Sequence, residues 1–289
     1  MMKILIVNES SSSGGAARAA MRLHRAYRRQ GIDSIFLSVS GVEEPSVLIE
    51  NNLFYRSLWW LKVKISRMLA KVILSKDTSY ASLNIFNNRR LVSRINSLTP
   101  DIVHLHWVGN EVLSPNDLYQ INAPLVWSLH DMWPFSVVTH YNGLFKSERS
   151  DFRAHIFYNY FYHRKSMAFA KLRGRLLMIG LSGWIAKESK QSDLGKIFPH
   201  AVLPNPINYG SFKWMPQSEV RQIMNIGHGE KVILFGAMSS TSDTRKGYEH
   251  LKEALKYVNA ENVTLIIYGS DEVDKDLEEI FRCKYLGYI

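Results

Sequence analysis

Cysteine is almost absent from this sequence, since Cys283 is the only one among 289 residues. A single thiol excludes an internal disulfide framework and any metal site built from several cysteines, and it suits a reducing compartment. Long apolar runs are also lacking. No stretch approaches the ~18 consecutive apolar residues of a transmembrane helix, and the run at residues 3–7 is too short for a signal peptide. We therefore expect a cytoplasmic protein, either free or peripheral at the inner face of the cell membrane.

The signature of a dinucleotide-binding enzyme is missing at two points. The loop at residues 8–17 is rich in serine and glycine but does not read GxGxxG. The strand expected at residues 32–39 lacks the acidic residue that would bind a ribose. Both absences argue against an NAD(P)-dependent enzyme.

Recognisable nucleic-acid-binding motifs are absent as well, although the chain is strongly basic. The formal net charge is +10 and the pI is about 9.5. Such a charge favours anionic partners. Without a known motif we do not expect nucleic acid, which leaves phosphate-bearing substrates and anionic lipid as the partner classes.

Strands and helices alternate along the chain, which predicts an α/β protein with parallel sheets. Two prolines in Pro204-Asn205-Pro206 interrupt regular structure. We place the boundary close to them, giving a doubly wound Rossmann-like domain at 1–210 and an incomplete second Rossmann-like domain at 211–289. The expected strands are residues 3–7, 32–39, 102–108, 125–129, 176–181, 201–203, 231–236, 263–268 and 285–289.

The stretch Ala123–Phe135 is the strongest local pattern. An apolar run rich in Leu, Val and Trp is opened by Pro124 and closed by His130-Asp131. It is typical of a buried parallel strand. Ligands of open α/β sheets bind beyond the carboxyl ends of the strands, so this polar pair is expected to line a ligand crevice.

A second pair of histidines, His104 and His106, shares one face of the neighbouring strand because a strand repeats every two residues. With His130, Asp131 and His140 these side chains could form a metal site. The alternative is a polar lining for the crevice. No close-set ligand motif such as HExxH is present, so we assign no metal.

Residues 54–76 contain six Lys or Arg and no acidic residue. At helical spacing, one face carries apolar side chains and the opposite face carries basic ones. A basic amphipathic helix with tryptophans suits the surface of an anionic membrane. The alternative is a helix packed on the sheet with a solvated basic back. The apolar set is Leu58, Leu61, Ile65, Met68, Leu69 and Val72, and the basic set is Arg56, Lys64, Arg67 and Lys71.

Two short segments are suited to phosphate. Gly14 and Gly15 lead into a helix, where backbone amides can approach an anion, although they could serve turn geometry alone. Arg245 and Lys246 precede a helix of the second domain, where cations suit a pyrophosphate. Their alternative is a solvated basic turn.

Six segments, in this order and spacing, resemble the family-4 glycosyltransferases of GT-B architecture, in the branch linked to bacterial exopolysaccharide and colanic-acid-type synthesis. The resemblance implies a retaining transfer of a sugar from a nucleotide-sugar donor to a saccharide or lipid-linked acceptor, without a metal or other cofactor. The segments are KILIVNESSSSGGAARAA, PDIVHLHWVGNEVLS, VWSLHDMWPFS, LSGWIAKESKQS, VLPNPIN and VILFGAMSSTSDTRKGYEHLKEAL.

The same resemblance assigns roles to residues. Gly14 and Gly15 match the glycine loop that approaches the donor phosphates and the acceptor. His130 matches the histidine that contacts the donor sugar. Arg245 and Lys246 match, or lie beside, the residues that hold the donor diphosphate. Asn205 lies in the interdomain segment, where Pro206 replaces the glycine that the family usually has.

One departure from the family concerns the donor side. The paired glutamates that bind the donor lie beyond the segment resembled by residues 285–288, and this sequence has no residues there. We therefore expect a C-terminally truncated enzyme with weak or absent transfer. The alternative is a non-catalytic relative that binds saccharide or membrane. An in-frame or frameshifted continuation encoding the glutamate segment would favour an interrupted enzyme.

Overall fold

The computed structural model describes residues 2–50, 52–74, 81–141, 152–210, 212–239, 241–270 and 272–288. The chain forms two compact units, Met1–Asn208 and Tyr209–Ile289. Each unit has its own parallel sheet and its own apolar core. The two units are described separately below.

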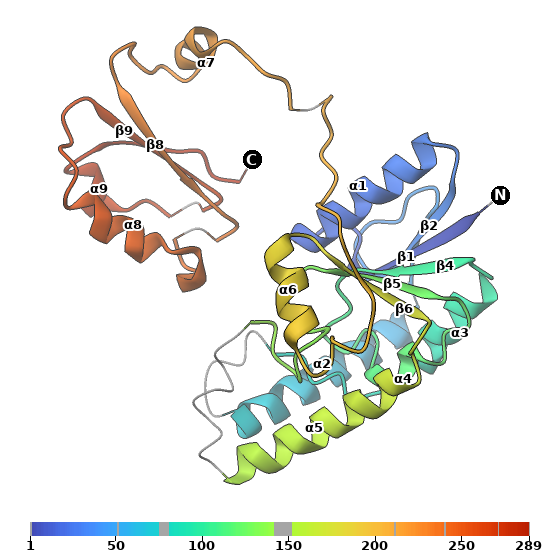
Figure 1. Cartoon of the computed structure of the whole chain (residues 1–289). Coiled ribbons are helices and arrows are strands. Elements are labelled where there is room, and N and C mark those ends of the chain that lie inside the picture. The colour runs from blue at the N-terminus through green and yellow to red at the C-terminus, as the bar shows by residue number, and fades with distance from the viewer. Residues whose placement is uncertain are drawn as a thin grey trace. The chain divides into compact units, whose positions relative to one another are not determined.

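The first unit is built on a seven-stranded sheet in which every neighbouring pair is parallel (Figure 1). The strand order is β3-β2-β1-β4-β5-β6-β7, so the order changes direction between β1 and β4. This is the topological switch point at which such sheets bind ligands. The predicted doubly wound architecture is confirmed, whereas the edge strand β3 was not predicted. The strands are β1 (Lys3–Ser10), β2 (Asp33–Ser40), β3 (Val47–Ile49), β4 (Ile102–Leu105), β5 (Leu125–Leu129), β6 (Leu176–Gly180) and β7 (His200–Val202).

Alternating residues of the central strands pack into different cores. Ile4 and Ile6 of β1 pack against Ala20 and Met21 of α1 (Gly15–Arg29). Leu5 and Val7 of β1 belong to the larger core with the remaining helices. A strand that is apolar on both sides in this way is what a sheet covered on both faces requires.

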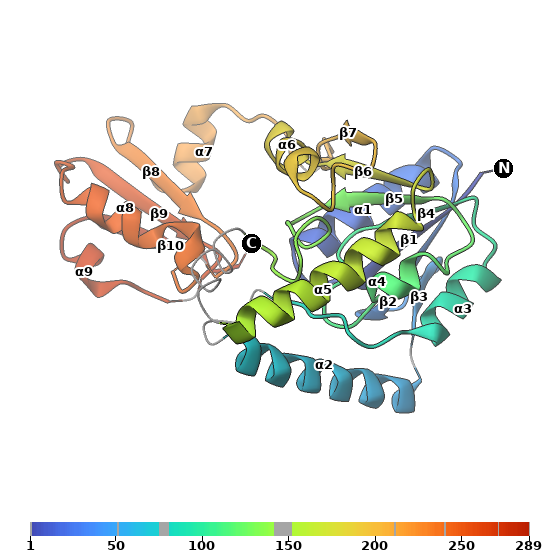
Figure 2. The ribbon, with the colours of Figure 1, turned by 60° about the horizontal axis from the view of Figure 1, so that its bottom comes forward.

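The helices of the larger core are α2 (Leu53–Leu74), α3 (Arg89–Ser97), α4 (Pro115–Leu118), α5 (Phe152–Ala170) and α6 (Gly183–Gln191). The short α4 begins with a capping box, because the Ser114 hydroxyl accepts from the Asp117 amide and the Asp117 carboxylate accepts from the Ser114 amide. Figure 2 shows α2 alongside α5, and the two helices are in contact. No described helix is long and apolar enough to cross a membrane.

The orientation of α2 differs from the prediction. Its buried face carries Tyr55, Trp59, Val63 and Ala70. The predicted core face is instead exposed, with Leu61 53% and Val72 77% accessible. The reason is that α2 is apolar on more than one side, so periodicity alone could not tell which apolar side would meet the sheet. The predicted packing of this face on the sheet is therefore wrong.

The second unit holds a three-stranded parallel sheet in the order β10-β9-β8. The last strand begins three residues earlier than predicted, and the helix before it is capped by Asp274 and has only four residues. Residue 289 of the predicted last strand lies outside the described residues. The elements are α7 (Gln217–Ile223), β8 (Lys231–Gly236), η1 (Thr244–Lys246), α8 (Tyr248–Leu255), β9 (Val263–Tyr268), α9 (Lys275–Glu278) and β10 (Arg282–Tyr285).

Candidate functional site

The carboxyl ends of β1, β4 and β5 meet at the switch point of the first unit. Hydrogen-bonded register places Val7 beside Leu105, and Leu105 beside Trp127. The residues that follow β5 are therefore close to those that follow β4. As predicted, His130 and Asp131 come directly after a buried strand.

Asp131 is the central acceptor of a hydrogen-bonded set of side chains, the polar wall, which consists of Asp131, Trp107, His140 and Ser82. Its Oδ2 accepts from the indole Nε1 of Trp107 at 2.7 Å and lies 2.6 Å from Nδ1 of His140. Its Oδ1 accepts from the backbone amide of Trp133 at 2.9 Å. The rings of Trp107 and His140 stack with centroids 5.3 Å apart. Charge-assisted bonds of this kind hold three segments of chain, around Trp107, Asp131–Trp133 and His140, together at one buried carboxylate.

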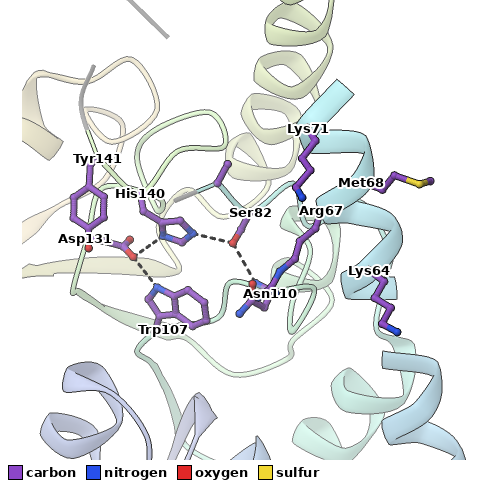
Figure 3. Close-up of a pocket in the computed structure, with 11 residues that line it drawn as sticks. Lys64, Arg67, Met68, Lys71, Ser82, Trp107, Asn110, Asp131, His140 and Tyr141 are labelled. Atoms are coloured by element: carbon purple, nitrogen blue, oxygen red, sulfur yellow. Dashed lines mark hydrogen bonds and ion pairs between the residues drawn. The ribbon is translucent and has the colours of Figure 1, made fainter. Parts of the chain in front are cut away.

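The network continues from His140 to Ser82, whose Oγ lies 2.8 Å from His140 Nε2 (Figure 3). Ser82 Oγ also accepts from the Asn110 backbone amide at 3.2 Å. The order Ser82, His140, Asp131 is that of a hydrolase triad. However, Ser82 is only 4% exposed and its oxygen is already bonded to Asn110. We therefore interpret Ser82, His140 and Asp131 as a structural part of the polar wall and not as a catalytic triad.

A cavity of about 630 Å³ lies against this wall. Helix α2 supplies the other side, and Figure 3 shows Arg67 and Lys71 extending from α2 toward the wall with Ser82 and Asn110. The size falls within the range of ordinary small-molecule sites. The lining residues are Lys64, Arg67, Met68, Lys71, Ala81, Ser82, Trp107, Asn110, Asp131, His140 and Tyr141.

Three imidazoles form a row next to Asp131, with His104 and His106 buried and His130 partly buried. The rings of His104 and His106 are 4.5 Å apart, which confirms that they share a face of the strand. Nδ1 of His106 lies 2.8 Å from Nε2 of His130, and Nε2 of His104 lies 2.9 Å from Oγ of Ser128. Among the described residues, His106 Nε2 has no hydrogen-bond partner.

Burial decides the charge of these histidines. Loss of solvation and, to a smaller extent, nearby His130 together lower the pKa of His104 to about 4. Loss of solvation also lowers the pKa of His130 to about 4, against the opposing effect of Asp131. The pKa of His106 lies well below its ordinary value for the same reason. All three rings are therefore neutral near pH 7.

No group of three or more His, Cys, Asp or Glu in the described part of the chain has the arrangement to hold a metal ion. The neutral imidazoles bond to one another and to Ser128, while Asp131 bonds to indole, amide and imidazole. The arrangement suits hydrogen bonding to an uncharged polar ligand such as a hydroxylated sugar.

A family model for Glycosyltransferase Family 4 matches residues 13–170, which is more than half of the chain and includes the wall, α2 and the histidine row. The chain belongs to Glycosyltransferase Family 4. Among curated proteins, no match to the sequence was found.

Solved structures similar to this glycosyltransferase share its fold. HepE (Alr3699) of Anabaena, in complex with UDP-glucose, has 17% identity and a TM-score of 0.55, over 100% of this chain and 70% of HepE. A glycosyltransferase of Rickettsia africae has 13% identity and a TM-score of 0.54, over 100% and 68%. WaaG, involved in lipopolysaccharide biosynthesis, has 13% identity and a TM-score of 0.52, over 99% and 70%. This likeness shows a Rossmann-like fold of the GT-B class.

Gly14, Gly15 and Asn205, which were also predicted for the site, are not among the residues that line this cavity. Gly14 has φ +90° just before α1, a conformation that favours glycine, and a Cβ on either Gly14 or Gly15 would meet open space. Asn205 is exposed in a segment without regular structure. Their predicted ligand contacts stay predictions.

Arg245 and Lys246 form the single turn η1 in the second unit of the enzyme. The guanidinium of Arg245 bonds to Asp243, with Nε 2.9 Å from Oδ1 and a second nitrogen 2.5 Å from Oδ2. This pair holds the pKa of Asp243 below its ordinary value. A diphosphate at Arg245 would therefore compete with Asp243, while Lys246 is exposed.

Lys165 of α5 supports the wall and was missed in the sequence. It is 1% exposed, and its Nζ donates to the carbonyl oxygens of Trp133 and Ser136. It lies 3.8 Å from the centre of the Trp133 ring. Burial lowers its pKa well below the ordinary value. Nothing in a run of helical residues signals that one lysine points inward to reach carbonyls 32 and 29 positions away.

Proposed function

We propose that this glycosyltransferase transfers a sugar from a UDP-sugar to a saccharide or lipid-linked saccharide in bacterial polysaccharide synthesis, with retention of anomeric configuration. Family membership supports sugar transfer. The structure of HepE with UDP-glucose supports a nucleotide-sugar donor. The exopolysaccharide branch rests on the resemblance of the sequence segments given above.

The observation that carries this proposal is the cavity at the switch point, because it lies within the region that matches the family. Its polar wall offers hydroxyl, amide, carboxylate and imidazole groups, which suit saccharide hydroxyls. We assign the acceptor to this cavity.

In this proposal the donor is held by other residues. His130 contacts the transferred sugar as a neutral imidazole, since burial lowers its pKa to about 4. Gly14 and Gly15 approach the phosphates, and Arg245 and Lys246 stabilise the departing diphosphate. Asn205 belongs to the segment that joins the units. The reaction needs no metal and no cofactor besides the donor, so EDTA should leave the rate unchanged.

Replacing His130 by Ala should lower the rate of UDP-sugar consumption about a hundredfold, because a hydrogen bond to the reacting sugar is lost. The rate is measured as UDP release from a panel of UDP-sugars with saccharide acceptors. His155 of α5 is exposed, so His155→Ala should retain the wild-type rate. Equal rates in His130→Ala and wild type would remove His130 from the mechanism. If the wild type binds the saccharides but releases no UDP from any UDP-sugar, a non-catalytic saccharide-binding protein is favoured.

We also propose that α2 contacts an anionic membrane surface. Its exposed side carries Leu58, Leu61, Met68 and Val72, which are 40%, 53%, 60% and 77% accessible. Basic side chains lie on the same helix, and this combination is typical of interfacial helices.

Binding to vesicles tests the membrane proposal. Leu61→Ser with Met68→Ser should reduce co-sedimentation with phosphatidylglycerol vesicles at least fivefold, because each change removes apolar area from the lipid contact. Ile280 is 61% exposed in the second unit, so Ile280→Ser serves as the control. Undiminished sedimentation of the double variant would refute the contact.

A further inference from the structure

The cavity of the first unit has a basic side that the proposed sugar transfer does not explain. Lys64, Arg67 and Lys71 all line it. They lie three and four positions apart on α2, so they share one side of the helix. Three cations at one cavity wall create a positive potential that favours an anion.

No acidic side chain in the described part of the chain forms an ion pair with any of these three cations. The acid that lines the cavity, Asp131, is occupied by Trp107, His140 and the Trp133 amide. Glu9 is the other acid near Arg67; burial raises the pKa of its carboxyl, while a hydrogen bond from Asn110 and the charge of Arg67 lower it. Three cations thus face two acids, Asp131 and Glu9, so this side of the cavity keeps an excess of positive charge.

We propose that the acceptor carries an anionic group, a phosphate or a carboxylate on its sugar, which Lys64, Arg67 and Lys71 hold. This rests on the assignment of the acceptor to the cavity. A volume of about 630 Å³ exceeds what an isolated phosphate needs, so a sugar ring can be bound with it. The neutral hydrogen-bonding groups of Ser82 and Asn110 then face the ring hydroxyls, and Arg67 can bind the anion in bidentate fashion.

The position of the cations favours a pocket ligand over a lipid headgroup. They line the cavity, while the exposed apolar side of α2 carries Leu58, Leu61 and Val72. Met68 lies at the border, since it lines the cavity and is also exposed, whereas Leu58, Leu61 and Val72 do not line the cavity.

Saturation-transfer difference NMR with three probes tests the proposal. The probes are glucose 6-phosphate, glucuronic acid and the uncharged methyl α-glucoside, each in excess UDP so that the donor site is filled. The wild type should bind at least one charged probe about tenfold more tightly than methyl glucoside. The triple variant Lys64→Gln, Arg67→Gln, Lys71→Gln should lose this preference. Arg56→Gln changes an exposed cation of α2 outside the cavity and should retain it.

Each outcome separates the alternatives. A phosphate or a carboxylate preference identifies the anionic group. Equal binding of charged and neutral probes, or a preference that survives in the triple variant, overturns the proposal. Loss of vesicle binding in the triple variant without any probe preference in the wild type also overturns it, in favour of lipid. Failure to release UDP in the activity assay, with the probe preference intact, would reject sugar transfer but leave the anion site standing.

Discussion

Acidification from pH 7 to pH 4.5 is expected to remove about 5 kcal/mol from the unfolding free energy of the first unit through His104 and His130. Burial lowers both pKa values from 6.5 to about 4 in the folded protein. The unfolded chain therefore binds protons first as the pH falls below 6.5. The stabilising contribution is complete above that pH and is lost as the pH approaches 4.

Buried carboxyls act in the opposite direction. Burial raises the pKa of Glu9, Glu111 and Asp117. Their protonation at low pH therefore increases the unfolding free energy of the protein. A comparison of variants isolates the histidine effect from this background. His104→Gln keeps a polar group near Ser128 and should reduce the acid-induced loss by about 2.5 kcal/mol.

Urea unfolding followed by tryptophan fluorescence measures the effect, because Trp214 is the one tryptophan of the sequence outside the first unit. The exposed His228 provides the control, and His228→Gln should show the same acid-induced loss as the wild type. If His104→Gln and the wild type lose equal unfolding free energy between pH 7 and pH 4.5, protonation of the buried His104 does not cause the loss.

Replacing Asp131 by Ala is expected to lower the unfolding free energy by about 4 kcal/mol. Three buried donors would lose their acceptor: the Trp107 indole, the Trp133 amide and the His140 imidazole. Asp131 is 7% exposed, so water cannot easily replace the carboxylate. The substitution would also disturb the cavity, since Trp107 and His140 line it and would lose a hydrogen-bond partner.

The matched control is Asp193, which forms an exposed ion pair with Lys196. Asp193→Ala should change the unfolding free energy by less than about 0.5 kcal/mol, as is usual for surface pairs. Both variants are compared by urea unfolding at pH 7. A loss below 1 kcal/mol for Asp131→Ala would mean that the three donors find other partners.

The strands were predictable where the apolar pattern is compatible with only one kind of secondary structure. Leu125–Leu129 is apolar on both sides and ends at a polar pair, and β8 and β9 lie at the predicted residues. The edge strand β3 was missed because three residues carry too little pattern. Helix α2 was found, but its buried face was assigned wrongly because several of its sides are apolar.

The site was predictable only in part. His130 and Asp131 could be placed from the strand that precedes them, and His104 and His106 from the two-residue period. The bond from Ser82 to His140 spans 58 positions, and Lys165 reaches Trp133 across 32. No local pattern indicates such pairs. Likewise, the prediction placed Lys64, Arg67 and Lys71 either at a membrane surface or on a solvated basic face; the three are exposed, and the structure adds that they line a cavity.

The sequence by itself determined the α/β class, the parallel strands and the location of His130-Asp131 beyond a strand end, because these follow from short-range periodicity and turn chemistry. Only the tertiary structure decided which side of α2 is buried, which groups donate hydrogen bonds to Asp131 and which cations line the cavity without an ion pair to the described residues. Those features depend on packing between segments far apart in the chain. The polar pair at the end of β5 thereby becomes one wall of a cavity whose other wall is basic.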